Sequence, residues 1–568
     1  MQISNKVLII GLDGATWDVL DPWIADGSLP YLAKLREEGS WGELRSSIPP
    51  ITAAAWSTFM TGKRPGKHGL YHFIDLFGNT KADDSPQIVN ARSMKSSTLW
   101  DILGHNDQKV GLINVPMTYP PRPINGFMVT SLLTPKNATV FTYPTELSDQ
   151  LREDYIIDLD RFVDKKPFQG QLDSEAKRTT SETAPTLTLM KEFQEMLESR
   201  AKHTLSLIDS QDWAVFMVVF TGTDRMGHYL WPYHRSATKD DNLETQQLCQ
   251  AVYNYYKRLD EIVGELLEKT DEDTTVIVMS DHGMGPIHTK RMHCNYWLQQ
   301  KGWLTAKKEK GAGAINNSAS LLHSLGLPRD KIGRLVFRIP GLAKSRFIRK
   351  AATSRSAVVD TEQSQAYCLP MYSNFWGIRI NLKGEKKEAL RQEIMEELKK
   401  ITDPETGHLV VRQVYRGEDY YYGPYANNIP DIIVMMDPDY GCNPHLGRYS
   451  APVTQLQVDR SDGDHRFEGI FVAKGSQIAA NPNLPDLAIE DVAPTILYLM
   501  GLPVPTDMDG RVLTEILQPT TLETHPIEFG DPVAVWPNES EAIFYDEVMS
   551  AEDEAELRER LQALGYLE

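Results

Sequence analysis

Short apolar runs that end in glycine, aspartate or threonine recur along the chain and predict buried strands. Residues 7–12, 213–220 and 276–279 are each apolar over about the length of one strand. Runs without polar alternation are typical of strands covered on both faces of a parallel sheet. Amphipathic stretches with helical spacing precede two of these runs, at residues 187–207 and 248–268. The pattern therefore predicts an α/β fold with a mostly parallel central sheet and helices on both faces.

Shorter segments extend this alternation and then interrupt it. Residues 29–38 and 97–103 read as helices. After Pro286 the pattern changes to a basic, helix-like stretch, which fits either a lid or a solvated insertion. This change of pattern predicts a single core whose two sequence segments are separated by insertions. The predicted segments are a first core part at 1–299, a helical insertion or lid at 300–365, a small α+β insertion at 366–440, a second core part at 441–516, and a C-terminal wrapping segment with a short helix at 517–568.

Composition is that of an ordinary globular protein of more than one compact unit. The chain has 568 residues, of which 41% are hydrophobic and 24% charged. A net charge of −19 argues against non-specific nucleic-acid binding by the surface. The N-terminal sequence lacks a signal-peptide pattern, and no apolar run is long enough to cross a bilayer, so the sequence predicts a cytoplasmic protein.

The chain has four cysteines, and they lie far apart in sequence. No C-x-x-C pair occurs, so the spacing predicts reduced, mostly buried thiols and neither a disulfide framework nor a cysteine zinc site. The four are Cys249, Cys294, Cys368 and Cys442.

Potential metal ligands stand at or near the ends of four predicted strands. A single aspartate or histidine at such a position is more often a helix cap or a packed side chain. It is much less expected that the residues at all four strand ends have only such structural roles. The carboxyl ends of parallel strands share one edge of a sheet, where ligands bind. Carboxylate and imidazole ligands without thiolate suit Zn, Mn or Fe. The candidate ligands are Asp13, Asp224 with His228, Asp281 with His282, and His465.

Two of these ligand groups carry a local prediction. Gly283 and Gly285 allow a sharp turn after Asp281 and His282, so that both side chains reach one metal. If a helix begins near residue 222, Asp224 and His228 lie four residues apart on one helix face. Together the candidates could hold two metals at the spacing used for displacement at phosphorus.

Thr52 opens a predicted Ala-rich helix after two prolines. A hydroxyl at this position is most often a helix cap. The same place also offers backbone N–H groups and the positive end of the helix dipole to an anion. A basic, glycine-rich loop follows at residues 62–69, but its spacing is not that of a P-loop.

This ordered set of motifs resembles the alkaline phosphatase superfamily, and specifically its type I phosphodiesterase/nucleotide pyrophosphatase branch. The resemblance covers roughly residues 7–510, and the ordered set is more specific than any one motif. It implies an alkaline-phosphatase-like fold. The motifs that carry it are Gly11-Leu12-Asp13-Gly14, Pro50-Ile51-Thr52 to Thr61-Gly62, Pro65-Gly66-Lys67-His68-Gly69, Asp224-x-x-x-His228, Ser280-Asp281-His282-Gly283, and His465.

The resemblance implies a role for each matched position. Thr52 would be the nucleophile that forms a covalent phospho-enzyme intermediate. One divalent metal would be held by Asp13, Thr52, Asp281 and His282, and the other by Asp224, His228 and His465. Zinc is the expected metal, with Mn or Fe as alternatives.

Two departures from the family pattern concern the substrate. Nucleotide pyrophosphatases carry an asparagine shortly after the His-Gly pair, whereas this chain has Leu70-Tyr71-His72-Phe73 there. His72 or Asn114 could supply the missing donor, and Lys63 or Arg64 could contact a phosphate. The C-x-P-x-R motif of the related sulfatases is absent, which argues against sulfatase activity.

The sequence thus favours a two-metal phosphohydrolase, and specifically a phosphodiesterase that acts on a small phosphoester. Phosphotransferase or phosphomutase chemistry at the same site is an alternative, as is a metal-binding scaffold without catalysis. A scaffold has no need of a hydroxyl at Thr52, so the complete set of candidates favours an enzyme.

Overall fold

The computed structural model describes residues 6–77, 87–158, 183–307, 359–446, 449, 451–455, 463–535, 550–563 and 566. The chain forms two compact units. The first unit comprises Met1–Ile287, Glu418–Ile429 and Asp459–Glu568, and the second comprises His288–Gly417 and Pro430–Val458.

A nine-stranded sheet forms the centre of the first unit. Its middle strands are the apolar runs that the sequence pattern identifies, and β6 and β7 are buried at every position. In sheet order the strands are β18 (Asn481–Ala488), β2 (Ser40–Arg45), β17 (Glu468–Lys474), β7 (Thr274–Met279), β1 (Lys6–Leu12), β6 (Val215–Phe220), β3 (Val110–Ile113), β4 (Gly126–Val129) and β5 (Thr142–Tyr143).

The sheet is mostly parallel, as predicted. β7, β1, β6, β3 and β4 run in one direction, with Leu12 opposite Phe220 and Gly11 opposite Met279. β17 is antiparallel to both β7 and β2, and β5 is antiparallel to β4. The carboxyl ends of β1, β6 and β7 therefore lie side by side at one edge of the sheet.

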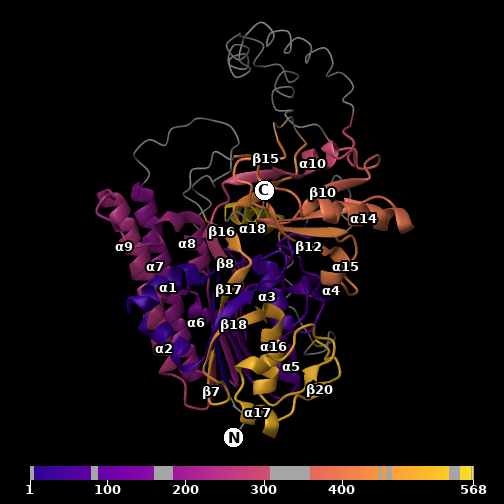
Figure 1. Ribbon diagram of the computed structural model, residues 1–568. Helices are drawn as coiled ribbons and strands as arrows, with labels where there is room; N and C mark the ends of the chain where they lie inside the picture. Colours follow the sequence, from indigo (N-terminus) through magenta and orange to yellow (C-terminus); the bar gives the residue numbers. More distant parts are fainter. Residues whose placement is uncertain are drawn as a thin grey trace. The chain divides into compact units, whose positions relative to one another are not determined.

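Helices cover both faces of this sheet (Figure 1). Figure 1 shows α2, α7 and α9 together on one side, and α3, α5 and α16 on the other. α2 and α9 are amphipathic and bury one face, as the helical spacing predicts, whereas α3 and α16 are buried at every position. The bounds are α2 Pro30–Glu38, α7 Thr183–Ser210, α9 Leu243–Leu267, α3 Thr52–Thr61, α5 Leu99–His105 and α16 Val492–Leu499.

The second unit has its own sheets and its own apolar core. A four-stranded antiparallel sheet has the order β10 (Ala366–Pro370), β11 (Phe375–Ile380), β13 (Ile432–Met436) and β12 (Val411–Arg416). A three-stranded sheet pairs β14 (Tyr440–Asn443) and β15 (Val453–Gln455) with β9 (Lys290–His293). Two helices complete the unit's main elements, α10 (Cys294–Gln300) and α14 (Gly384–Leu398).

The sharp turn predicted after His282 is wrong. Residues Gly283–Pro286 form an extended strand, β8, which pairs with β16 (Gly463–Arg466). A Cβ on Gly283 would collide with the carbonyl oxygen of Glu468, and one on Gly285 with the guanidinium of Arg466. These glycines therefore permit a close approach between strands. The residues that they approach are almost 200 positions away in the sequence, so no local pattern indicates this role.

Two other sequence predictions concern regions that are described only in part. The lid or helical insertion predicted at 300–365 falls mainly on residues 308–358, which lie outside the described residues. The wrapping segment predicted from residue 517 includes 536–549, which also lie outside them. Among the described helices, none combines the length and apolar character needed to cross a membrane.

His68, in the short helix α4 (Pro65–His68), is a buried neutral histidine. The Leu70 backbone N–H donates to its Nδ1 (3.2 Å), so its proton lies on Nε2, which faces Thr58 Oγ1 at 3.1 Å. Burial, and then the charge of Lys63, lowers the pKa of His68 to about 3. The folded protein therefore excludes a proton that the unfolded chain binds below the ordinary histidine pKa.

Acid is expected to destabilise the first unit through this residue. Between the ordinary pKa and about 3 the unfolded chain binds one more proton at His68 than the folded chain. The contribution of His68 to stability should therefore fall as the pH falls, by up to about 1.4 kcal/mol per pH unit, and stay constant above pH 7. Urea unfolding at pH 7 and pH 5 should show a smaller loss in His68→Gln than in the wild type. The exposed His408 is the control, and an equal loss in His408→Gln and His68→Gln would contradict the assignment.

Candidate functional site

Three of the predicted acidic ligands lie next to one another because neighbouring strands deliver them. Asp13 follows β1, Asp281 follows β7, and Asp224 lies in the first turn of α8 (Gly222–Leu230), directly after β6. All three are at most 1% exposed. Gly14 makes this proximity possible, because its φ is +68° and a Cβ there would lie 3.0 Å from Asp224 Cα.

His465 reaches the same edge by a route that the sequence pattern does not show. It lies in β16, just before β17, and β17 is antiparallel to β7. The amino end of β17 therefore lies at the carboxyl edge of the parallel strands. The ring of His465 stacks on that of His282, with centroids 3.6 Å apart.

Thr52 is the first residue of α3, and every residue of this helix is buried. Ile51, in an extended conformation, precedes it as the helix cap residue, so Thr52 itself is not the cap. Its Oγ1 lies 3.4 Å from His282 Nε2. The structure thus brings the predicted nucleophile to the predicted ligands, at the positive end of a helix dipole.

Each of the three carboxylates has one oxygen held by the protein and one without a hydrogen-bond partner. Trp56 Nε1 donates to Asp13 Oδ2 at 3.0 Å, and the Gly14 N–H donates to Asp281 Oδ1 at 3.2 Å. Arg225 Nη1 donates to Asp224 Oδ2 at 2.7 Å. The other oxygen of each is buried without a hydrogen-bond partner among the described residues. A buried, unpaired carboxylate oxygen is costly, so these three atoms together favour a bound cation.

Two of the predicted histidine ligands are also held by the protein through one ring nitrogen each. His465 Nδ1 donates to the carbonyl oxygen of Pro50 at 2.7 Å, and His282 Nδ1 donates to that of Gly283 at 3.0 Å. A carbonyl can only accept, so in each neutral ring the lone pair lies on Nε2. His465 Nε2 lies 2.9 Å from His228 Nε2 and 3.2 Å from Asp224 Oδ1. Fixing one nitrogen by a carbonyl is the usual arrangement behind a metal-binding imidazole.

Burial and crowding of like charges dominate the electrostatics. Burial, and then the charge of Asp224, raises the pKa of Asp13 to about 8. Burial, and then the charge of Asp13, raises the pKa of Asp281 well above its usual range. Burial opposes ionisation of Asp224 too, but His228 and His465 hold its pKa well below the usual range. Without cations, Asp13 and Asp281 would therefore hold protons at neutral pH, and bound cations would allow all three carboxylates to ionise.

The ligand atoms fall into two overlapping groups. One consists of Asp13, Asp281 and His282, and the other of Asp224, His282 and His465, with the atoms of each group within 4.8 Å of one another. His228, one helical turn after Asp224, adjoins the second group. Oxygen and nitrogen donors without sulfur fit Zn, Mn or Fe. The residues present therefore fit the two cations that the resemblance implies.

The basic residues predicted to contact a phosphate bind acidic side chains instead. Lys63 Nζ binds Asp507 Oδ2 at 2.5 Å and Arg64 Nε binds Glu490 Oε1 at 3.0 Å. Lys67, in the same loop, pairs with Asp509 at 2.5 Å. Acidic side chains from residues 490–509 thus neutralise this loop, and a role in packing the loop against that segment accounts for its charges.

The two predicted polar substrate contacts are both buried. Asn114 uses its amide N–H to bind the carbonyl oxygen of Val219 at 3.0 Å, which ties β3 to β6. His72 is 5% exposed, and burial lowers its pKa to about 4. Neither makes a hydrogen bond to Thr52 that the structure records, so both remain candidates from sequence alone.

The site also contains two residues to which no sequence motif assigns a role. Arg225 adjoins Asp224 in the chain and also binds Asp158, with Nη2 to Oδ2 at 3.1 Å. Tyr566 places its hydroxyl 3.1 Å from Thr52 Oγ1. The position of Arg225 beside a predicted ligand could have identified it. No local signal marks Tyr566, which is 514 residues from Thr52.

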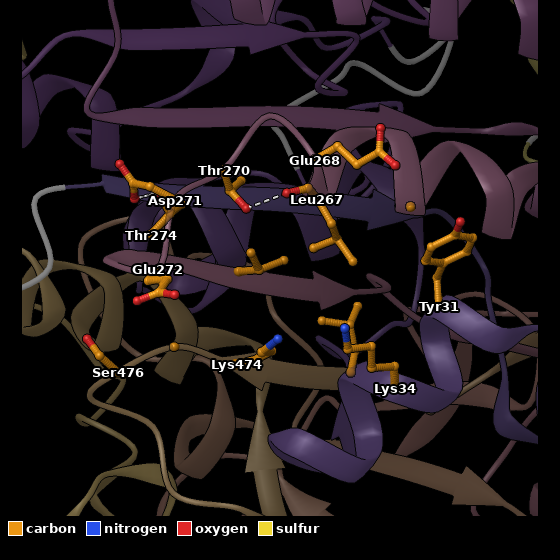
Figure 2. Close-up of a pocket in the computed structure, with 14 residues that line it drawn as sticks. Tyr31, Lys34, Leu267, Glu268, Thr270, Asp271, Glu272, Thr274, Lys474 and Ser476 are labelled. Atoms are coloured by element: carbon orange, nitrogen blue, oxygen red, sulfur yellow. Dashed lines mark hydrogen bonds between the residues drawn. The ribbon is translucent and has the colours of Figure 1, made fainter.

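A hollow of about 560 Å³ lies away from this site (Figure 2). It is lined by Thr274, which opens β7, and by Lys474, which ends the antiparallel β17. Asp281 follows the other end of β7, so the hollow lies at the opposite edge of the sheet. None of its lining residues is a predicted site residue, and it plays no part in the chemistry considered below.

Comparison with known proteins gives a family match. A model of the family "type I phosphodiesterase / nucleotide pyrophosphatase" matches residues 7–334, more than half of the chain. The matched segment contains Asp13, Thr52, Asp224, His228, Asp281 and His282, and His465 lies beyond it.

Solved structures resemble the chain in fold. A phosphonoacetate hydrolase from Sinorhizobium meliloti 1021, in complex with phosphonoformate, has a TM-score of 0.50 and 14% identity, and the match covers 87% of this chain and 94% of that one. A murine ectonucleotide pyrophosphatase / phosphodiesterase 5, an inactive form in complex with AMP, has a TM-score of 0.46 and 12% identity over 90% of this chain and all (100%) of that one.

One curated relative matches over a short stretch. The catalytic subunit of human GPI ethanolamine phosphate transferase 3 is 30% identical over 83 residues, which is 15% of this chain and 6% of that protein. The chain thus matches only a small part of the length of this relative.

Proposed function

The chain belongs to the type I phosphodiesterase / nucleotide pyrophosphatase family, and we propose that it is a two-metal phosphodiesterase with Thr52 as its nucleophile. The single observation that carries the proposal is the position of the Thr52 hydroxyl. It lies at the start of α3, 3.4 Å from His282 Nε2, among three carboxylates whose unpaired oxygens need cations.

Two divalent cations would complete the site. Asp13, Asp281 and His282 would hold one of them beside Thr52, and Asp224, His228 and His465 would hold the other. When bound, such cations neutralise the phosphoryl oxygens and favour the deprotonated form of a hydroxyl ligand. Zinc suits this donor set, with Mn and Fe as alternatives.

The chain's own residues would position and activate the nucleophile. The N-terminus of α3 places unpaired backbone N–H groups and a positive dipole end beside Thr52 Oγ1. The contacts of Trp56 and Arg225 fix the orientation of two of the carboxylates, so these ligands need little reorientation when cations and substrate bind.

The proposed reaction has two displacement steps. Thr52 Oγ1 attacks phosphorus, an Oγ1–P bond forms, and the bond from phosphorus to one ester oxygen breaks. The proton of Thr52 is released, and the departing alcohol takes up one proton. Water then attacks the phosphothreonine, the Oγ1–P bond breaks, and the second product is a phosphate monoester.

A substrate panel and metal analysis would test the proposal. The wild type should bind at least two metal ions per chain, two of them at this site, and cleave bis(p-nitrophenyl) phosphate faster than p-nitrophenyl phosphate. A metal-replete protein that cleaves neither compound, nor any other phosphoester in a broad panel, would contradict the proposal and favour a scaffold. Faster cleavage of the monoester would instead reassign the substrate class and leave the nucleophile in place.

Removing the imidazole of His465 is expected to release one metal ion. His465→Ala should bind one ion per chain fewer than the wild type, because only the group with Asp224 and His228 loses a ligand. We expect kcat to fall at least about 100-fold. Inductively coupled plasma analysis of dialysed protein gives the stoichiometry. Retention of both ions would contradict the assigned ligand set, and the exposed His408→Ala serves as the control.

Transfer to an alcohol is the alternative use of the same intermediate. The observation that favours it is the 83-residue match to the catalytic subunit of a phosphate transferase. A phosphothreonine could be attacked by an alcohol oxygen in place of water, with the same bonds formed and broken at phosphorus. Product analysis with added glycerol or ethanolamine separates the two, since a transferase yields a new phosphodiester whose amount rises with the acceptor.

A further inference from the structure

Tyr566 enters the candidate site from a helix that is anchored to the first unit. The helix α18 (Ala551–Ala563) buries Leu557 and Leu561, which are 1% and 0% exposed. Arg560 Nη1 donates to the carbonyl oxygens of Leu132 and Thr134, both at 3.1 Å. The Tyr566 N–H donates to the Leu561 carbonyl oxygen at 2.9 Å, which ties the tyrosine to the helix. The position of the tyrosine is therefore built into the fold.

The hydroxyl of Tyr566 joins three residues of the site. It donates to Asp224 Oδ2 at 2.9 Å and accepts from Arg225 Nη1 at 3.0 Å. A phenol has a single proton, and here Asp224 receives it. In the contact with Thr52 Oγ1, at 3.1 Å, Thr52 is therefore the donor and the phenol oxygen the acceptor. The aromatic ring packs on Phe73, with centroids 4.6 Å apart, and Tyr566 is 2% exposed.

These contacts place Tyr566 behind the cation ligands. Asp224 Oδ2 accepts from Tyr566 and Arg225, so its other oxygen, Oδ1, faces His465 and His228. Asp13 has the same arrangement, in which Trp56 holds Oδ2 and leaves Oδ1 unpaired. Groups that hold the second oxygen of a metal-binding carboxylate fix its orientation and set much of its metal affinity.

We propose that Tyr566 is a positioning residue of the phosphoryl-transfer site, which orients Asp224 for its cation and holds the Thr52 hydroxyl in one rotamer. This inference rests on the proposed function, because it assumes that Asp224 binds a metal and that Thr52 reacts. It assigns to α18 a part in building the site, through a contact between residues 514 positions apart.

The test isolates the Asp224 cation by working in an Asp281→Asn, Cys442→Ser background. The first change removes a ligand of the other cation at this site, and the second removes a thiol from the cysteine cluster described below. Zinc affinity is measured by competition with a chromophoric chelator. Adding Tyr566→Phe should weaken zinc binding about 10-fold to 100-fold, because the hydroxyl is lost while the ring still packs on Phe73. Adding Trp56→Phe instead should leave this affinity unchanged, because Trp56 contacts Asp13.

Turnover and zinc affinity of the Tyr566 variants distinguish a positioning role from a packing role. In the otherwise wild-type chain, Tyr566→Phe should lower kcat more than it changes KM, since the phenol contacts the nucleophile. Unchanged zinc affinity in Tyr566→Phe would overturn the inference and leave the tyrosine a packing role. A rise in activity in Tyr566→Phe or Tyr566→Ala would also overturn it, because it would show that the phenol obstructs the substrate. Failure of the wild type to bind two metals would overturn the proposed function instead, so the two failures are distinguishable.

A second, independent feature is the convergence of three cysteines in the second unit. Cys294 opens α10, Cys368 lies in β10 and Cys442 lies in β14. Cys442 Sγ lies 3.1 Å from Cys294 Sγ and 3.8 Å from Cys368 Sγ, and all three sulfurs lie within 4.8 Å of one another. The remaining cysteine of the chain, Cys249, lies in α9 of the first unit.

The three thiols form a donor set suited to a soft metal ion. Thiolates around tetrahedral zinc lie about 3.8 Å apart, since each Zn–S bond is about 2.3 Å. Burial raises the pKa of Cys294 and of Cys368, so both remain protonated until a cation displaces the protons. Cys442 is only partly buried, which provides a path for an ion. The neighbouring His293 is engaged with Thr454 at 2.7 Å and Asn443 at 3.1 Å, so three sulfurs are the ligands at hand.

We infer that these cysteines bind a thiophilic cation, with Zn²⁺ as the expected ion and one coordination position open to an external ligand. The spacing of the cysteines in the sequence predicts the opposite, namely no cysteine zinc site. That prediction uses short sequence motifs, whereas strands β10 and β14 bring Cys368 and Cys442 to Cys294 across 74 and 148 residues.

Cobalt substitution tests this site apart from the catalytic one. Cobalt added to reduced, metal-free protein should give a thiolate-to-cobalt charge-transfer band in the near ultraviolet, which oxygen and nitrogen ligands do not produce. The band should be lost in Cys442→Ser and Cys368→Ser and kept in Cys249→Ser, and zinc should displace it. Absence of the band in the wild type, or its persistence in Cys442→Ser, would overturn the inference and leave the cysteines as packed thiols.

Discussion

Thr52→Ala is expected to lower kcat by at least about three orders of magnitude while the protein stays folded and keeps most of its metal. The hydroxyl is the only group of this residue with a chemical role in the proposed reaction, and without it no phospho-enzyme forms. Alanine is a good helix former and follows at the next three positions of α3, so the backbone should not change. Activity is measured on bis(p-nitrophenyl) phosphate, and acid-quenched wild type is searched for phosphothreonine by mass spectrometry.

Two variants separate the nucleophile from a general effect on α3. Thr52→Ser retains a hydroxyl and should recover a large part of the activity. Ser57→Ala removes another buried hydroxyl of the same helix, one that binds only the Ala53 carbonyl oxygen, and should leave kcat within a few-fold of the wild type. Near-normal turnover by Thr52→Ala would exclude the covalent mechanism and point to direct attack by water.

The strand ends could be read from the sequence because they depend on short-range patterns. The apolar runs before Asp13 and Asp281 are long enough for buried strands and are almost free of polar residues. Parallel neighbours share their carboxyl edge, so predicting the strands also predicted that these aspartates lie together. Asp224 and His228 followed from helical spacing, which α8 bears out.

The remaining features depend on contacts between residues far apart in the chain. The strand at Gly283, the antiparallel entry of His465 and the insertion of Tyr566 all arise from segments that pair across more than 150 residues. No local period or motif records such a partner. In the basic loop, long-range contacts remove a role that the local sequence suggests. Lys63 and Arg64 are residue types typical of a phosphate site, but Asp507 and Glu490 neutralise them.

Asp281→Asn should have opposite effects on the metal-bound and the metal-free protein. Asparagine keeps an oxygen for the Gly14 N–H but removes the charge from the unpaired Oδ2. With metal, kcat/KM should fall by about 100-fold to 1,000-fold, and one ion per chain should be lost. Without metal, the free energy of unfolding at pH 7 should rise by about 1 kcal/mol or more, because burial and the charge of Asp13 make an ionised Asp281 unfavourable.

The pH dependence gives the sign of this second effect. A carboxyl whose folded pKa is raised binds a proton in the folded chain that the unfolded chain has released. In the metal-free protein the contribution of Asp281 to stability should therefore fall as the pH rises from about 4 towards neutrality, opposite in sign to that of His68, and Asp281→Asn should lack this contribution. Asp260→Asn is the contrasting control. Burial raises the pKa of Asp260 too, but both of its oxygens accept backbone N–H groups, from Tyr31 and Leu32, and asparagine can satisfy only one of them. If Asp281→Asn destabilised the metal-free protein as Asp260→Asn does, the aspartate would be a structural cap and the cation site would need another ligand.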